Sequence, residues 1–201
     1  MNNKISQDDI IYFVVTDRFF GRNKKNADPS DTSIHGGTLD GIVEKLDYLL
    51  ELGVTTIWVT PVYENIQSHG TSEPYHYYWP QNFEQIDRRL LDGTRLPNSV
   101  DISTFGRFVD VCEARRIKVV LDMIINHAGY GAKGHFDPTW FNVGGSDDIK
   151  EEYIKEMLGF FKIDGVIYHN ARTCPNNSNN RYGLPLRFTK ESGVPHVVIN
   201  G

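Results

Sequence analysis

The sequence has few cysteines, no long apolar run and no cluster of basic residues, and each absence excludes a class of protein. Cys112 and Cys174 are the only cysteines among 201 residues; one lies on a predicted helix and the other in a polar loop. Neither a disulfide framework nor a cysteine-rich metal site is therefore expected. No segment reaches the length of a membrane span, and the first ten residues lack the apolar core of a secretory signal. We expect a cytoplasmic protein with no membrane partner.

The charge is mildly acidic, with 21 Lys and Arg against 26 Asp and Glu and a net charge of -5. Because a nucleic-acid-binding surface needs clustered positive charge, nucleic acid is not expected as the main partner. A small polar or neutral substrate remains open. Aromatic residues make up 12% of the chain, and many lie near turn residues, where rings either stack on sugars or fill a core.

Apolar strands and amphipathic helices alternate along the first 127 residues. The pattern predicts strands at 10–15, 54–60 and 117–127, and helices at 38–50 and around 105–116. Gly53 ends the first helix, and the segment 65–97 is long, aromatic and irregular. Three apolar strands separated by helices predict a parallel sheet with right-handed crossovers.

Two α/β folds fit this order, a doubly wound sheet and a (β/α)8 TIM barrel. No G-x-G-x-x-G motif follows the first strand, whereas polar residues follow the carboxyl ends of all three strands. Active sites of barrel enzymes lie at that end of the strands. The sequence therefore favours the barrel.

The third predicted strand ends in three polar groups, Asp122, Asn126 and His127, among aliphatic residues. A buried carboxylate without a partner costs several kcal/mol, so Asp122 needs one. A structural ion pair and a direct role in chemistry are both open.

Five segments resemble the α-amylase family of glycoside hydrolases and transglycosidases, and they occur in the family's order. L-D-M-I-I-N-H at 121–127 is similar to its first signature, and Y-H-Y-Y-W at 75–79 to its Tyr-His-Gly-Tyr-Trp segment. Three further segments resemble the family's first strand, first helix and second strand. They are, in that order, I-Y-F-V-V-T-D-R-F at 11–19, G-G-T-L-D-G-I at 36–42 and V-T-T-I-W-V-T-P-V-Y-E-N at 54–65.

The resemblance implies a role for each matching residue. Tyr78 would stack on the sugar at the cleavage position, with His76 beside it, and His127 would donate a hydrogen bond to that sugar's hydroxymethyl group. Asn126 is similar to a structural calcium ligand, and Asp122 would orient an arginine on strand four. The alternative is that the aromatic residues pack the loop and that both histidines are structural.

The sequence departs from the family pattern at two places. Tyr77 replaces the usual glycine before Tyr78, which adds a bulky side chain to the loop. Some relatives bind calcium through a loop near the N-terminus. Candidate ligands for such a site remain at Asn23, Asn26 and Asp28, but Gly21 and Thr38 stand where acidic ligands are expected.

The resemblance also predicts a domain division. Residues 1–130 would form the N-terminal part of the barrel, with strands one to three. Residues 131–201 would form an excursion similar to the family's inserted domain, with a helix around 149–161, and would end before strand four.

The family's nucleophile and general acid lie on strands four and five, so the resemblance assigns no catalytic residue to this chain. G-F-F-K-I-D-G-V-I-Y-H at 159–169 superficially resembles the nucleophile signature, with Asp164 as nucleophile. The spacing from Asp164 to His169 and the lysine at 162 argue against that role.

Three functions follow. The first is a truncated α-amylase-family enzyme that acts on α-glucosidic linkages of starch-like polymers or maltooligosaccharides and lacks the catalytic carboxylates. The second is a sugar-binding or partner-binding remnant without catalysis. The third is an unrelated barrel enzyme that uses Asp122 and His127 as an acid-base pair. The open sheet edge of a partial barrel also predicts self-association.

Overall fold

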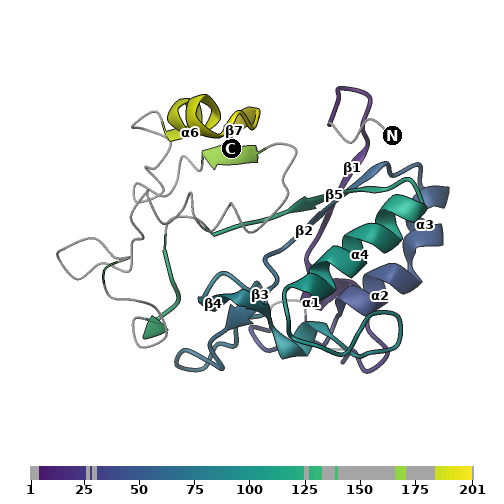
Figure 1. The fold of residues 1–201 in the computed structure, drawn as a ribbon. Helices are drawn as coiled ribbons and strands as arrows, with labels where there is room; N and C mark the ends of the chain where they lie inside the picture. The colour runs from purple at the N-terminus through teal and green to yellow at the C-terminus, as the bar shows by residue number, and fades with distance from the viewer. Residues whose placement is uncertain are drawn as a thin grey trace. The chain divides into compact units, whose positions relative to one another are not determined.

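The computed structural model describes residues 5–25, 28, 31–124, 127–132, 139, 166–170 and 184–200. They belong to two compact units (Figure 1). The larger unit comprises Ile5–Ile124 and Ala128–Thr139, and the smaller comprises Met1–Lys4, Ile125–His127 and Trp140–Gly201. The predicted division at residue 130 stays a prediction.

The larger unit is built on a sheet of three parallel strands, β1 (Ile11–Val14), β2 (Thr56–Val59) and β5 (Lys118–Leu121). Their order is β1-β2-β5, with Ile11 opposite Thr56 and Thr56 opposite Lys118. The predicted parallel strands are therefore confirmed. The third strand is shorter than predicted, because it ends at Leu121 and Asp122 follows it directly.

Four helices accompany the sheet: α1 (Thr16–Phe19), α2 (Leu39–Glu44), α3 (Leu46–Glu51) and α4 (Ser103–Ala114). The prediction of a single helix over 38–50 was wrong, because α2 and α3 are separate helices. At Lys45 the backbone has a ψ of 9°, and its N–H is shared between the carbonyl groups of Gly41 and Ile42, which tightens the turn. The predicted stop is confirmed, since Gly53 follows α3 with a φ of +81°.

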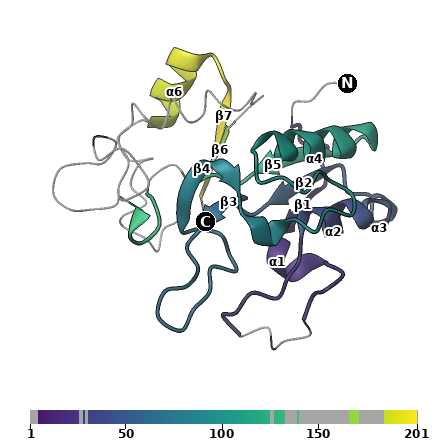
Figure 2. The same cartoon turned by 60° about the horizontal axis from the view of Figure 1, so that its bottom comes forward.

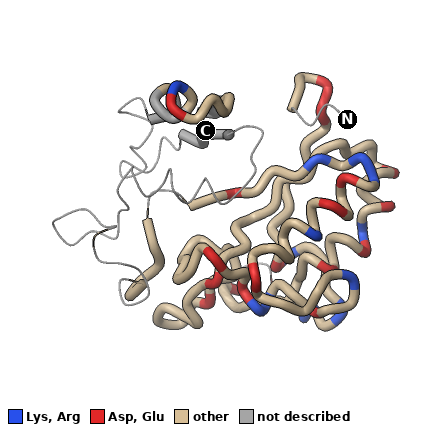
Figure 3. Tube along the Cα trace, in the orientation of Figure 1, with Lys and Arg blue, Asp and Glu red and all other residues tan. Residues whose placement is uncertain are grey.

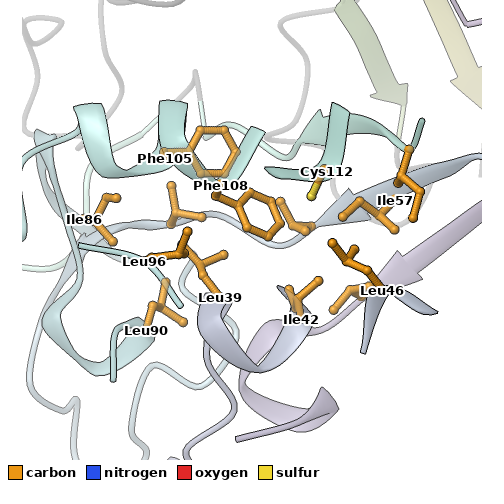
Figure 4. Packing of buried hydrophobic residues seen from close by; sticks show 14 of the residues in the cluster. Leu39, Ile42, Leu46, Ile57, Ile86, Leu90, Leu96, Phe105, Phe108 and Cys112 are labelled. Carbon is orange, nitrogen blue, oxygen red and sulfur yellow. The ribbon is translucent and has the colours of Figure 1, made fainter. Parts of the chain in front are cut away.

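One face of the sheet packs with α2, α3 and α4 to form the main core (Figures 2 and 4). Leu39 and Ile42 from α2 and Phe108 from α4 are fully buried, as is Ile57 from β2. Their positions match the apolar periodicity of the predicted helices. Cys112 is buried in the same cluster, and burial raises the pKa of its thiol to about 12, so it acts as an apolar residue.

The segment predicted to be irregular contains an antiparallel pair, β3 (Tyr63–Asn65) and β4 (Pro80–Ile86), followed by a 3₁₀ turn, η1 (Arg88–Leu90). The prediction of irregular backbone was therefore wrong over β4. Buried residues in β4 recur at every third position, because register shifts interrupt the pairing with β3. The sequence consequently lacks the alternation by which strands are recognised.

The smaller unit contains a parallel pair of strands, β6 (Val166–Asn170) and β7 (His196–Asn200), and helix α6 (Leu184–Ser192) between them in the chain. None of these elements was predicted. Pro185 stands in the first turn of α6, where a proline is tolerated although it reads as a loop signal. The predicted helix at 149–161, Lys162 and Asp164 lie outside the described residues.

Acidic and basic residues are interspersed along the described trace (Figure 3). This mixed distribution agrees with the absence of a basic block in the sequence. Within the described ranges, no helix is long and apolar enough to cross a membrane.

Candidate functional site

The carboxyl ends of the three parallel strands form a polar edge. Thr60 follows β2, and its hydroxyl accepts a hydrogen bond from the backbone N–H of Thr16 after β1 (3.1 Å) and donates to the Thr16 hydroxyl (3.0 Å). The backbone N–H of Asp122 donates to the carbonyl of Val59 (2.9 Å), which places Asp122 at the same edge. The polar residues that the sequence places after each strand therefore come together.

Asp122 is joined to Tyr78, which lies on the loop between β3 and β4. The Tyr78 hydroxyl donates a hydrogen bond of 2.6 Å to Oδ2 of Asp122. Burial, together with the neighbouring charge of Asp122, raises the pKa of Tyr78 well above its usual range, so the phenol stays protonated and donates. Asp122, which is half-buried, thus has a hydrogen-bond partner at this edge. The expected strand-four arginine stays a prediction.

His76 supports the backbone and the ring of Tyr78. Its Nδ1 accepts the backbone N–H of Tyr78 at 2.9 Å, and the two rings lie 5.6 Å apart at 30°. Because Nδ1 is an acceptor, the proton of the neutral ring is on Nε2. Burial lowers the pKa of His76 and favours this neutral form. His76 therefore offers one N–H donor beside Tyr78.

Asn65, at the end of β3, clamps the backbone on both sides of Tyr78. Its side-chain amide donates to the carbonyl groups of Tyr63 (2.8 Å) and Tyr77 (3.1 Å), and its Oδ1 accepts from the backbone N–H of Trp79 (2.7 Å). Only 3% of Asn65 is exposed. A single buried amide therefore fixes the chain before and after the sugar-stacking candidate.

Asp87 and Arg89 fix Asn65 in turn. Oδ2 of Asp87 accepts from the backbone N–H of Asn65 (2.9 Å) and from Nη2 of Arg89 (2.6 Å). The same Arg89 nitrogen donates to the carbonyl of Ile66 (3.0 Å). The buried carboxylate and the guanidinium thus join η1 to the end of β3.

Tyr77 has a φ of +62°, in the left-handed region that glycine adopts without strain. This backbone conformation explains why the family pattern has glycine at the position. The bulky side chain is accommodated by burial: Tyr77 is fully buried in the core cluster, and the Arg89 guanidinium lies 5.8 Å from its ring centroid. The Tyr77 hydroxyl is buried without a hydrogen-bond partner among the described residues.

Asp17 and Arg18, which follow β1, hold the loops beside the site. The fully buried Asp17 carboxylate accepts the backbone N–H groups of His35 (2.9 Å) and Gly36 (2.9 Å) and pairs with Arg18. The Arg18 guanidinium lies 4.2 Å from the ring centroid of Tyr75. The sequence did not assign these functions, although a charged pair directly after an apolar strand was the available signal.

The remaining predicted site residues are placed elsewhere. His127 belongs to the smaller unit, and Asn126 lies outside the described residues. The structure thus brings Tyr78, His76 and Asp122 together, whereas the role of His127 stays a prediction.

Gly21 and Thr38 have structural functions at the two positions where the resemblance predicts acidic calcium ligands. A Cβ atom at Gly21 would lie 2.1 Å from the carbonyl oxygen of Gly36, so this position has no room for an acidic side chain. The Thr38 hydroxyl instead caps α2 by accepting the N–H of Gly41 at 2.9 Å. No group of three or more His, Cys, Asp or Glu that could hold a metal occurs in the described part of the chain.

Comparison with known proteins gives a family match. Residues 13–184 match the model described as the alpha amylase catalytic domain. The chain belongs to the α-amylase catalytic domain family. Members of this family have the TIM-barrel fold, with which the parallel strands β1, β2 and β5 agree.

Curated relatives in the α-amylase family include hydrolases and transferases. The periplasmic alpha-amylase of Escherichia coli is 30% identical over 167 residues, which are 74% of this chain and 23% of the relative. The cyclomaltodextrin glucanotransferase of Thermoanaerobacterium thermosulfurigenes is 32% identical over 173 residues, 76% of this chain and 23% of the relative. The chain therefore spans about a quarter of the length of these relatives.

Solved structures give the same family. The alpha-amylase of Geobacillus thermoleovorans, complexed with acarbose, has a TM-score of 0.63 and 27% identity, covering 92% of this chain and 44% of that one. The family match therefore argues against an unrelated family of barrel enzymes.

Proposed function

We propose that this chain carries the sugar-recognition side of an α-amylase-family active site, for α-glucosidic linkages in starch-like polymers or maltooligosaccharides. The observation that carries the proposal is the Tyr78 ring, held at the carboxyl edge of the sheet by a 2.6 Å hydrogen bond to Asp122. A barrel enzyme binds substrate at this edge.

The chemistry of the site suits a sugar. A phenol ring lies flat against the C–H face of a pyranose, and the N–H at Nε2 of His76 donates to a hydroxyl group. The Asn65 clamp and the Asp122 bond fix the Tyr78 ring before the sugar arrives, which lowers the entropic cost of binding. His127 would supply a further donor, to the hydroxymethyl group.

Catalysis requires groups other than these. A retaining glycosidase uses two carboxyl groups about 5 Å apart, one as nucleophile and one as general acid. Asp122 accepts a hydrogen bond from Tyr78, so in our proposal it orients the stacking ring and is not the nucleophile. We further propose that β1, β2 and β5 are the first three barrel strands, that the catalytic carboxylates belong to strands four and five, and that this chain alone binds sugar without hydrolysing it.

Titration calorimetry with maltoheptaose tests the binding. Tyr78→Ala is expected to weaken the affinity about tenfold or more, because the ring and its hydrogen-bond network are lost. Tyr48→Ala is the matched control, since Tyr48 lies on α3 and is 49% exposed. Equal affinities of wild type and Tyr78→Ala would contradict the proposal. Reducing ends released by the wild-type chain would contradict the non-hydrolytic part of it.

A structural calcium ion held through Asn126 is a separate proposal from the resemblance, and the amide oxygen is a suitable hard ligand. Calcium is expected to raise the melting temperature, and Asn126→Ala to remove that shift, whereas Asn23→Ala would leave it unchanged. Identical melting curves with calcium and with a chelator would exclude the site.

We also propose that the chain self-associates through its sheet. Among the described strands of this sheet, β1 and β5 are the outer ones, and Ile11 and Phe13 on β1 are 44% and 47% exposed. Unpaired edge strands with apolar side chains favour association. Sedimentation velocity is expected to detect oligomers that Phe13→Lys reduces, and a monodisperse wild-type monomer would exclude this proposal.

A further inference from the structure

A row of aromatic rings leads away from Tyr78. Its neighbour His76 contacts the ring of Trp79 edge to face, with centroids 4.6 Å apart at 87°. Trp79 in turn contacts Tyr130, with centroids 5.6 Å apart at 62°. Because each ring touches the next, the surface that begins at Tyr78 continues without interruption to Tyr130.

The row ends in a stacked pair formed by His69 and Tyr130. The two rings are nearly parallel, at 13°, with centroids 3.9 Å apart, and His69 also lies 5.9 Å from Trp79. His69 is exposed, and Tyr130 is 51% exposed. The pair is therefore a flat aromatic surface that remains accessible to solvent, although neighbouring tyrosines such as Tyr77 are fully buried.

The backbone holds both members of the pair in place. The N–H of Gly129 donates to the carbonyl of Pro80 (2.7 Å), and the side chain of Gln81 donates to the carbonyl of Tyr130 (3.2 Å). A Cβ atom at Gly129 would lie 2.4 Å from the carbonyl oxygen of Trp79, so the two loops approach as closely as glycine allows. His69 is fixed by two backbone hydrogen bonds with Ser72, of 2.8 and 3.1 Å.

We propose that the His69–Tyr130 pair is an additional sugar-binding platform, which takes a glucose unit of an α-glucan further along the chain from the unit on Tyr78. The proposal rests on the proposed function, because the same glucan must occupy both positions. An exposed ring face with a hydroxyl and an imidazole nitrogen at its rim matches a pyranose, which has an apolar C–H face and a rim of hydroxyl groups. The unbroken row of rings supplies the continuity from one position to the other.

The platform predicts that affinity depends on oligosaccharide length. Wild-type chain is titrated with maltose and with maltoheptaose in a calorimeter, in parallel with Tyr130→Ala and His69→Ala. Loss of a ring contact is expected to weaken maltoheptaose binding about 3- to 10-fold more than maltose binding, because only the longer glucan reaches the platform. Tyr130→Phe keeps the ring and is expected to retain most of the affinity.

Two further variants separate this inference from the proposed function. Tyr78→Ala is expected to weaken both sugars, and Tyr48→Ala neither. If Tyr78→Ala weakens binding while Tyr130→Ala and His69→Ala bind maltoheptaose like wild type, the platform is excluded and the proposed function stands. If neither the wild-type chain nor any variant binds maltose or maltoheptaose, both the platform and the proposed function are excluded. Melting curves of each variant, compared with wild type, identify any loss caused by unfolding. If Tyr130→Ala unfolds, His69→Ala decides the question, because the backbone hydrogen bonds between residue 69 and Ser72 do not depend on the imidazole ring.

Discussion

The larger unit has a helical side and a loop side, and buried residues have different functions on each. Beneath the helices, Leu39, Ile42 and Phe108 are fully buried in an apolar cluster. In the loops at the carboxyl edge, Asn65 and Asp87 are almost as deeply buried, at 3% exposed, but they hydrogen-bond backbone groups. Tyr78 and Trp79 in these loops are only partly buried, so fewer apolar contacts are available there and buried polar groups fix the shape of the loops. The difference predicts which substitutions affect stability alone and which also affect binding.

Phe108→Ala tests the helical side, and we expect the largest effect there. The Phe108 ring is fully buried, and its centroid lies 5.5 Å from that of the Phe105 ring. Removing it should lower the free energy of unfolding by about 3–5 kcal/mol. Urea unfolding measures the change, with the exposed Tyr48→Ala as control, expected within about 0.5 kcal/mol of wild type. A loss below about 1 kcal/mol would mean that this cluster does not dominate stability.

Asn65→Ala tests the loop side. It removes three side-chain hydrogen bonds and leaves buried backbone groups of Tyr77 and Trp79 without partners. We expect a loss of about 2–4 kcal/mol in the free energy of unfolding and weaker maltooligosaccharide binding. Asn82→Ala is the matched control, because Asn82 makes an exposed bond to the N–H of Glu84. Wild-type affinity in a folded Asn65→Ala would show that the clamp does not position Tyr78.

The pH dependence of sugar binding tests His76. Its folded pKa lies below the ordinary value of about 6.5, so the folded state prefers the neutral ring. The contribution of neutral His76 to the stability of the folded state is complete above about pH 6.5 and is lost as the pH falls through the lowered pKa of His76. The reason is that a protonated Nδ1 no longer accepts the N–H of Tyr78. Calorimetry between pH 5 and pH 8, chosen to bracket about 6.5, should detect falling affinity on the acid side. His76→Phe should flatten this profile, whereas His196→Gln, in the smaller unit, should not; an unchanged profile in His76→Phe would refute the assignment.

Two tyrosine-to-phenylalanine substitutions give the smallest effects, with opposite signs. Tyr77→Phe removes a buried hydroxyl that has no partner among the described residues, so stability should rise by up to about 1 kcal/mol. Tyr78→Phe removes the hydroxyl bonded to Asp122 and should cost about 1–2 kcal/mol. Thermal melts of the pair measure both changes. The same sign for both would mean that the hydroxyl of Tyr77 finds a partner in solution.

The sequence predicted those features that depend on local patterns. The apolar runs predicted the three parallel strands, and Gly53 predicted the end of the first helical segment. Helix α6 and strand β4 were missed because Pro185 and the irregular register of β4 hide the usual periodicities. Local patterns thus identify elements whose residues repeat regularly.

The site was predicted only in part. The resemblance selected Tyr78, His76 and Asp122 but did not predict that Tyr78 and Asp122 contact each other. Asn65 and Asp17 were not predicted at all, because their partners are backbone groups far away in the sequence. In the sequence, a loop asparagine whose amide joins two separate segments cannot be distinguished from one whose amide faces solvent.

The position of β2 between β1 and β5 has a consequence for folding kinetics. Each pairing in the sheet, Ile11 with Thr56 and Thr56 with Lys118, joins residues separated by a complete helical crossover. Closing such long loops costs entropy before any strand contact offsets it, so a parallel sheet of this kind forms slowly. Substitutions that weaken β2 should therefore slow refolding more than equally destabilising substitutions in the β3–β4 hairpin, whose partners lie closer in the chain.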